Sequence, residues 1–265
     1  GSYFSEELIT RNNFPLSLQV EVGYPSGHYF ESHRKYATKL RNELKGKVIV
    51  SYMDNNSGDD FEASKAMQIS ILHMLMKLLE KNDDLVVLLK PKRQEEMNML
   101  LTNVPSLNGF ISKGKVKVYL GKSHGRRYVP ALIGMVSDIT IGLGLSTAAV
   151  ECYLSGSHVM HANLAKFTGE SFVEKGKGKV IFDDIQDLNE KLDCSIENIR
   201  NNCYPNKDEI FNIYSSLDGF QDGKSYMRIG EHISTIQKVL KNSESRDLAT
   251  RKLLELLVKR MMRSY

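Results

Sequence analysis

Short apolar segments alternate with helical patterns through the middle of this 265-residue chain. Six of the apolar segments have the length of buried strands, and they span residues 47–52, 85–89, 116–120, 138–141, 158–161 and 180–182. Between the first two, apolar residues recur at helical spacing, at Ala66, Ile69, Leu72, Leu75 and Leu79. Because strands joined by helices pair in parallel, the pattern predicts a parallel sheet of about six strands with crossover helices.

This alternation predicts a Rossmann-like, doubly wound α/β domain over residues 46–204. Residues 1–45 fit a linker or the remnant of a preceding N-terminal domain, and they include a basic helix near residues 33–44. Because the opening Gly-Ser resembles a cloning scar and no initiator methionine comes with it, we expect the chain to be a piece of a longer protein.

The C-terminal part, residues 205–265, has the pattern of a helical extension that packs on or near this domain. A Gly- and Asp-rich break interrupts it at residues 218–224, and a basic amphipathic helix follows through Leu253, Leu257 and Met261. The spacing of these apolar residues favours burial against the domain, and peripheral docking on a membrane is the alternative.

Composition argues against a membrane-spanning protein and against a disulfide-stabilised scaffold. The formal net charge is +4, 26% of the residues are charged, and no apolar run is long enough to cross a bilayer. The three cysteines are odd in number and lack Cys-x-x-Cys spacing, which favours a reducing compartment over a disulfide scaffold. We therefore expect a cytoplasmic protein, peripheral to the inner membrane if the last helix docks there, with no nucleic acid among its partners.

A tight turn joins the predicted fourth strand to a short helix between residues 138 and 156. Gly142 and Gly144 let the backbone approach a ligand closely, since glycine has no side chain and tolerates positive φ angles. Ser146 and Thr147 add hydroxyls where the first helical N–H groups have no partner, an arrangement that attracts phosphate. The same turn also occurs simply as tight strand-to-helix packing, so the glycines alone do not decide between the two.

Further polar and basic residues follow the predicted strands at the same sheet edge, where α/β domains bind ligands. Glu151, one helical turn beyond Thr147, is placed to reach a sugar hydroxyl. Lys90 ends the second strand, and the proline after it prevents a helix from starting at once. The remaining candidates lie in the loops after the first and third strands, and they are Asn55, Asn56, Ser57, His124, Arg126 and Arg127. Local turn formation and simple solvation also explain such residues.

Other kinds of site are disfavoured. His158 and His161 lie three apart on a strand and so point to opposite faces, which makes them packing residues rather than joint metal ligands. No Asp-x-Asp, Walker loop, nucleophile elbow or zinc pattern occurs, and we expect neither a metal nor a cofactor. A dinucleotide-binding dehydrogenase is set aside, because Thr147 takes the place of the third glycine and Asn163, not an acid, closes the next strand.

In their order along the chain, these residues resemble the donor-binding, C-terminal half of the GT-B glycosyltransferases. In that family a glycine- and serine-rich turn meets the donor phosphate, and a Glu further along the helix bonds the ribose. The corresponding residues here are Gly144, Ser146, Thr147 and Glu151, with Lys90 as an additional phosphate ligand. His158 stands where the family usually has a proline, and the spacing from Glu151 to Gly156 is unchanged.

A narrower resemblance, over residues 20–235, is to bacterial surface-polysaccharide or capsule biosynthesis transferases of the same type. It rests on Gly23-Tyr24-Pro25, Leu89-Lys90-Pro91-Lys92, the 218–224 segment and Arg228-Ile229-Gly230. Some relatives have a histidine where this chain has Lys92, so no histidine role carries over.

The resemblance implies transfer of a sugar from a nucleotide-activated donor to a glycan or lipid-linked glycan acceptor, without a metal or another cofactor. The general base of such enzymes commonly belongs to the N-terminal domain, so no catalytic residue is assigned. Two enzymes of the same fold are alternatives, a nucleotide-sugar epimerase and a phosphopolyol transferase. A noncatalytic scaffolding module is the alternative from a different class.

Overall fold

The computed structural model describes residues 21–54, 61–120, 129–169, 171–203, 207–215 and 217–242. The chain forms two compact units, one made of Tyr29–Ile213 and the other of the two terminal segments, Gly1–His28 and Tyr214–Tyr265.

The larger unit contains one parallel sheet. Its strands are β1 (Val48–Met53), β2 (Leu85–Lys90), β3 (Val116–Val118), β4 (Ile139–Leu143), β5 (His158–Ala162) and β6 (Ile181–Phe182). They are ordered β3-β2-β1-β4-β5-β6, and every neighbouring pair is parallel. All six strands coincide with the apolar segments of the sequence, and the doubly wound Rossmann-like fold is confirmed.

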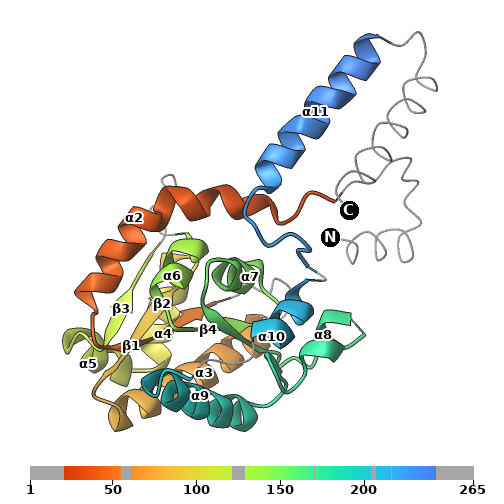
Figure 1. The fold of residues 1–265 in the computed structure, drawn as a ribbon. Helices are drawn as coiled ribbons and strands as arrows, with labels where there is room; N and C mark the ends of the chain where they lie inside the picture. Colours follow the sequence, from red (N-terminus) through yellow and green to blue (C-terminus); the bar gives the residue numbers. More distant parts are fainter. Residues whose placement is uncertain are drawn as a thin grey trace. The chain divides into compact units, whose positions relative to one another are not determined.

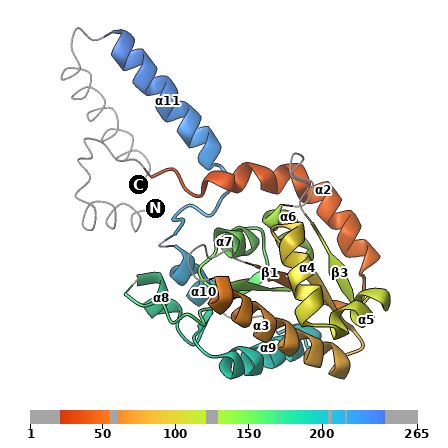
Figure 2. The ribbon, with the colours of Figure 1, turned by 180° about the vertical axis from the view of Figure 1, so that it is seen from behind.

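Helices cover both faces of this sheet, as expected for a parallel sheet. The helices that run through this part of the chain are α2 (His28–Glu43), α3 (Phe61–Lys81), α4 (Gln94–Asn103), α5 (Ser106–Ser112), α6 (Pro130–Val136), α7 (Thr147–Leu154), α8 (Ser171–Gly176), α9 (Ile185–Arg200) and α10 (Lys207–Tyr214). The long α3 is the predicted crossover helix. α3, α4 and α9 cover one face of the sheet, and α6 and α7 cover the other (Figures 1 and 2).

The strands are buried on both faces, which explains their continuous runs of Val, Ile and Leu. In β1, Val50 and Tyr52 join the apolar core that includes α3 and α9. Ser51 points to the opposite face, where its hydroxyl bonds Thr140 Oγ1 at 2.8 Å, and Thr140 in turn bonds Ser157 Oγ at 2.7 Å. The hydroxyls of this face therefore satisfy one another inside the core.

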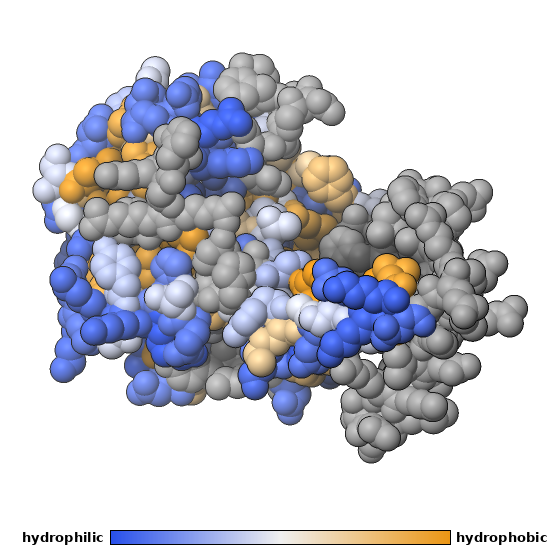
Figure 3. All heavy atoms as spheres, turned by 90° about the horizontal axis from the view of Figure 1, so that it is seen from above, coloured by the Kyte–Doolittle hydropathy of each residue, from blue (hydrophilic) through white to orange (hydrophobic). Residues whose placement is uncertain are grey.

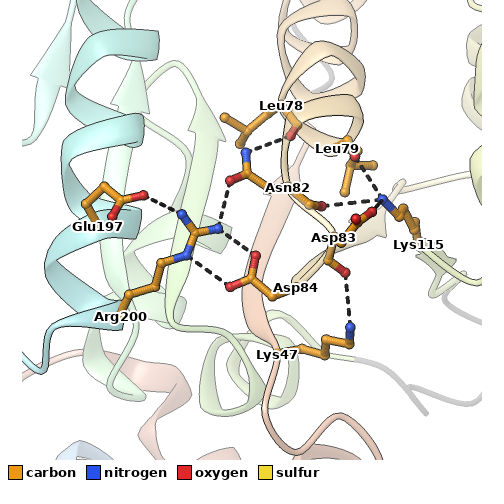
Figure 4. Close-up of polar contacts among 9 residues, drawn as sticks. All are labelled: Lys47, Leu78, Leu79, Asn82, Asp83, Asp84, Lys115, Glu197 and Arg200. Carbon is orange, nitrogen blue, oxygen red and sulfur yellow. Dashed lines mark hydrogen bonds and ion pairs between the residues drawn. The ribbon is translucent and has the colours of Figure 1, made fainter.

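A charged network closes the edge of the sheet at which the strands begin (Figure 4). Arg200, at the end of α9, bonds both carboxylate oxygens of Asp84 at 2.6 and 3.0 Å, and it also bonds Asn82 Oδ1 at 2.7 Å. Lys115 pairs with Asp83 at 2.8 Å. The network joins the end of α3 and the start of β2 to α9, away from the ends of the strands where ligands are expected.

In the smaller unit, the segment before α2 contacts the break that precedes α11 (Ser225–Lys241). The buried carboxylate of Asp218 accepts hydrogen bonds from the backbone N–H groups of Tyr24 at 3.2 Å and Phe220 at 3.0 Å. A Cβ on Gly27 would lie 2.5 Å from the Cα of Gly223, so the two backbones are in direct contact. Two motifs far apart in the sequence therefore form one structural junction, and the predicted helix through Leu253, Leu257 and Met261 lies outside the described residues.

Exposed apolar side chains are scattered over the described surface. Hydrophobic residues show at several separate places among mostly hydrophilic ones (Figure 3). The large ones are Phe167, Phe211, Phe220, Tyr226, Met227, Ile233 and Leu240. None of the helices in the described part of the chain is long and apolar enough to span a membrane.

Candidate functional site

The strand order reverses between β1 and β4, and doubly wound sheets bind their ligands at such a point, beyond the carboxyl ends of the strands. A pocket of about 190 Å³ opens there. Its walls come from the ends of β1 and β2, from the start of α6 and from the turn between β4 and α7. The lining residues are Met53, Asp54, Lys90, Lys92, Pro130, Ser146, Thr147 and Ala148.

Packing against the neighbouring helix and strand shapes the turn from β4 into α7. A Cβ on Gly142 would lie 2.5 Å from the Cβ of Ala149, so this glycine is required by the close approach of strand and helix. Gly144 has a φ of +62°, which favours glycine. Its N–H donates to Ala162 O at 2.9 Å, and its carbonyl accepts from His161 Nδ1 at 3.1 Å. Both polar backbone groups of Gly144 are thus bonded to β5.

The N-terminus of α7 faces the pocket. Ser146 is the N-cap residue, and its buried hydroxyl accepts a hydrogen bond from the Ala149 N–H at 3.2 Å. Thr147 and Ala148 are the first two helical residues, and both line the pocket. The N–H groups of a first helical turn have no partner within their helix, and the helix dipole adds partial positive charge. This wall of the pocket therefore favours an anion.

Lys90 supplies a full positive charge on the other side of the pocket. The side chain is half-buried, and burial lowers the pKa of Lys90, whereas the nearby Asp54 and Glu96 act to raise it. In the described part of the chain, its only hydrogen bond runs from Nζ to Pro91 O at 3.4 Å. A partly desolvated ammonium with one long hydrogen bond can accept a further, anionic partner at little cost.

Two carboxylic acids beside Lys90 were not identified from the sequence as site residues. Asp54 follows β1 directly and is buried, and its Oδ2 accepts the Lys92 N–H at 2.9 Å. Glu96, in the first turn of α4, is also buried, and its Oε2 accepts the Arg93 N–H at 2.8 Å. The two side chains are hydrogen-bonded to each other. Burial raises the pKa of Asp54 to about 8, and the hydrogen bond that protonated Asp54 donates to Glu96 adds to the rise.

One signal in the sequence could have revealed Asp54. This residue comes directly after a strand whose every residue is buried, and its position alternates onto the same face as Val50 and Tyr52. An acid directly after such a strand is therefore expected to be buried. Glu96 precedes Leu100 by one helical turn and adjoins Met97, and these three are the buried residues of α4. The helical spacing of Met97 and Leu100 is the signal that could have revealed it.

The other predicted site residues are placed as follows. Glu151 lies one turn beyond Thr147 on α7, outside the pocket lining, where its charge acts to raise the pKa of Lys90. The predictions for Asn55, Asn56, Ser57, His124, Arg126 and Arg127 fall on residues outside the described ranges. His161 is a fully buried packing residue, with its ring edge on Phe172, and burial lowers its pKa to about 4. Residues 21–242, apart from the gaps in description, contain no group of three or more His, Cys, Asp or Glu that could hold a metal ion.

The pocket has the size and lining of a site for a small oxyanion, and it is called the oxyanion pocket below. Its volume of about 190 Å³ lies below that of a pocket for a whole drug-sized ligand. Lys90, Lys92 and the first turn of α7 contribute donors and positive charge to its lining, and Asp54 contributes an acid.

No family model and no curated protein matches the chain. Among solved structures, it is similar to a UDP-forming α,α-trehalose-phosphate synthase from Burkholderia xenovorans, with 11% identity and a TM-score of 0.47 over 80% of this chain and 50% of that one. A second is the N-terminal domain of a trehalose-6-phosphate phosphatase from Candida albicans, with 14% identity and a TM-score of 0.44 over 75% of this chain and 44% of that one. The chain thus spans about half the length of either protein, and neither similarity is strong enough to indicate a substrate or the role of a residue.

Proposed function

We propose that this chain is the donor-binding half of a metal-independent GT-B glycosyltransferase, which transfers a sugar from a nucleotide-activated donor to a bacterial surface glycan. The observation that carries the proposal is the oxyanion pocket at the switch point of the sheet. Lys90 and the first residues of α7 both line it, which supports binding of a donor diphosphate.

In this proposal the pocket acts on the leaving group. Cleavage of the bond between sugar and phosphate leaves negative charge on the nucleotide diphosphate. The N–H groups of Thr147 and Ala148 and the ammonium of Lys90 are positioned to stabilise that charge as it develops. Ser146 contributes through its N-cap hydrogen bond, which fixes the first turn of α7. Glu151 is kept as the ribose ligand, reached by the part of the donor that lies outside the pocket.

The remaining partners belong to the complete enzyme. The acceptor is a glycan or a lipid-linked glycan, and we place the reaction in the cytoplasm, peripheral to the inner membrane. The general base is provided by another domain. A nucleotide-sugar epimerase or a phosphopolyol transferase would use the same pocket, whereas a scaffolding module would not need it.

Calorimetric titration with a panel of nucleoside mono- and diphosphates, in buffer containing a chelator, tests the donor site. We expect selective binding of a diphosphate, weakened about tenfold or more in Lys90→Gln because a charge-assisted hydrogen bond is lost. Lys115→Gln is the matched control, since this lysine pairs with Asp83 at 2.8 Å in the network at the opposite edge of the sheet. A folded chain that binds no nucleotide, or an equal loss in both variants, would contradict the proposal.

Product analysis separates the enzymes that share the pocket. The full-length protein would be incubated with the sugar nucleotide whose diphosphate binds, with and without acceptor. Free nucleoside diphosphate that appears only with acceptor supports glycosyl transfer. A changed sugar on an intact nucleotide identifies an epimerase, and release of a nucleoside monophosphate identifies a phosphopolyol transferase.

A further inference from the structure

The carboxyl groups of Asp54 and Glu96 form a hydrogen-bonded pair next to the oxyanion pocket, and Asp54 is part of the pocket wall. Each carboxyl also accepts one backbone N–H, from Lys92 at 2.9 Å and from Arg93 at 2.8 Å. Those contacts hold both side chains in place, so they cannot swing apart into water. Two oxygens in a carboxyl–carboxyl hydrogen bond require a proton between them.

We propose that Asp54 and Glu96 hold one proton between them, and that its loss weakens the binding of an oxyanion at Lys90. The pair is then a built-in pH control on the donor-phosphate site. This inference rests on the proposed function for the identity of the natural ligand, but its physical basis concerns the pocket alone.

The groups around the pair favour the singly protonated state. Both acids are buried, and two carboxylates in contact resist being charged together. The charged or titratable groups around the pair are Tyr52 on β1, Lys90 at the end of β2 and Lys92 just after it. From α7, Glu151 and Cys152 act on Lys90. Of these groups, Lys90 favours the fully ionised pair, yet burial and the hydrogen bond from protonated Asp54 to Glu96 still raise the pKa of Asp54 to about 8.

Tyr52 is a further polar group buried in this corner. Its hydroxyl is completely buried and has no hydrogen-bond partner among the described residues. Burial raises the pKa of Tyr52, and the nearby charges of Asp54 and Glu96 add to the rise. A buried hydroxyl without a partner makes additional negative charge beside it no easier to hold, so the surroundings of the pair provide little solvation for a second charge.

The effect on the pocket follows from charge. With one proton on the pair, the ammonium of Lys90 is available to an oxyanion. When the pair loses this proton, it carries a second negative charge in the pocket wall. That charge attracts Lys90 and repels the ligand. By linkage, binding of an anion must also raise the proton affinity of the Asp54–Glu96 pair. Binding is therefore accompanied by proton uptake at pH values near 8.

A titration without any ligand tests the proton itself. The chain would be labelled with ¹³C at aspartate carboxyls, and the Asp54 signal would be assigned by its loss in Asp54→Asn. We expect this signal to move near pH 8, and titration in the ordinary aspartate range, near 3.9, would overturn the proposal.

Sulfate is the probe for the coupling, because it remains a dianion between pH 6.5 and 9. Its affinity would be measured by shifts of the Thr147 and Ala148 amide signals. If the anion binds only the protonated pair, the affinity falls about tenfold between pH 7 and pH 9 in the wild type. Asp54→Asn, a neutral isostere that still accepts the Lys92 N–H, should abolish this fall. A fall that persists in Asp54→Asn would assign it to Lys90 instead and overturn the proposal.

Asp184→Asn is the matched control. Asp184 caps α9 by accepting from the Gln186 N–H at 2.6 Å, away from the pocket, and asparagine is an equally good N-cap. It should keep the wild-type pH dependence. The two proposals can fail separately. Sulfate binding with this pH dependence, but without nucleotide binding, would contradict the donor-site proposal. Nucleotide binding that does not depend on pH would contradict the shared proton.

Discussion

At the residue scale, the acids and histidines of the core make stability depend on pH in opposite directions. Burial and Glu96 raise the pKa of Asp54 to about 8. Between pH 4 and 8 the unfolded chain releases this proton while the folded chain retains it, so the free energy of unfolding falls as the pH rises, by up to about 1.4 kcal/mol per pH unit. Asp54→Asn cannot titrate. We expect its stability relative to the wild type to increase from pH 4 to pH 8 and then level off, as measured by urea denaturation.

His161 shows the opposite sign. Burial lowers the pKa of His161 to about 4. On acidification, His161 therefore becomes protonated in the unfolded chain at a higher pH than in the folded chain. Stability is therefore lost as the pH falls from about 6.5 to about 4. His161→Asn should be less stable at pH 7, because the bond to Gly144 and the ring contact with Phe172 are altered. It should nevertheless lose less stability on acidification than the wild type does. His73→Asn, an exposed change on α3, serves as control, and an unchanged acid slope in His161→Asn would contradict this account.

At the scale of elements, the turn between β4 and α7 packs tightly and also lines the oxyanion pocket. A Cβ on Gly142 would lie 2.5 Å from the Cβ of Ala149, so Gly142→Ala must push α7 away from β4. We expect a loss of about 1–3 kcal/mol in the free energy of unfolding, the usual cost of overpacking, together with weaker sulfate binding as the first turn of α7 shifts. Gly109→Ala in α5 is the control, since its Cβ meets nothing within 4 Å and alanine favours a helix. Equal effects of the two changes on sulfate binding would show that α7 does not need this position.

The same elements show how far sequence could predict this fold. The six strands and α3 were predictable because burial on both faces forces continuous apolar runs, and because one buried helical face repeats at fixed spacing. The turn before α7 was also predictable, since glycines and hydroxyls mark it, whereas its role as a ligand site stays a prediction. Gly144, however, uses its N–H and carbonyl to bond β5, and Ser146 uses its hydroxyl as a cap. Whether a polar group faces a ligand or a neighbouring strand depends on contacts between segments distant in the sequence, which local patterns do not contain.

Contacts between distant segments also explain what the sequence missed. Asp54 and Glu96 meet only because β1 and β2 are neighbours in the sheet, although α3 and β2 separate them along the chain. Arg200 likewise bonds Asp84 across 116 positions. Arg200 and Asp84, taken alone, have the appearance of solvated charges. Only the folded sheet brings Asp54 and Glu96 together at one edge, and Arg200 and Asp84 together at the other.

At the scale of the whole molecule, the larger unit carries both the apolar core and the oxyanion pocket. The core residues run from Val48 to Ile196, and every pocket residue lies between Met53 and Ala148. A fragment of residues 28–215, which keeps α2 and α10 intact, should therefore fold cooperatively on its own and bind sulfate with the affinity and pH dependence of the full chain. Circular dichroism in urea and the Thr147 and Ala148 amide shifts would measure the two properties. If the fragment folds but no longer binds sulfate, the pocket of the larger unit is not sufficient for anion binding, which contradicts its assignment as the donor-phosphate site.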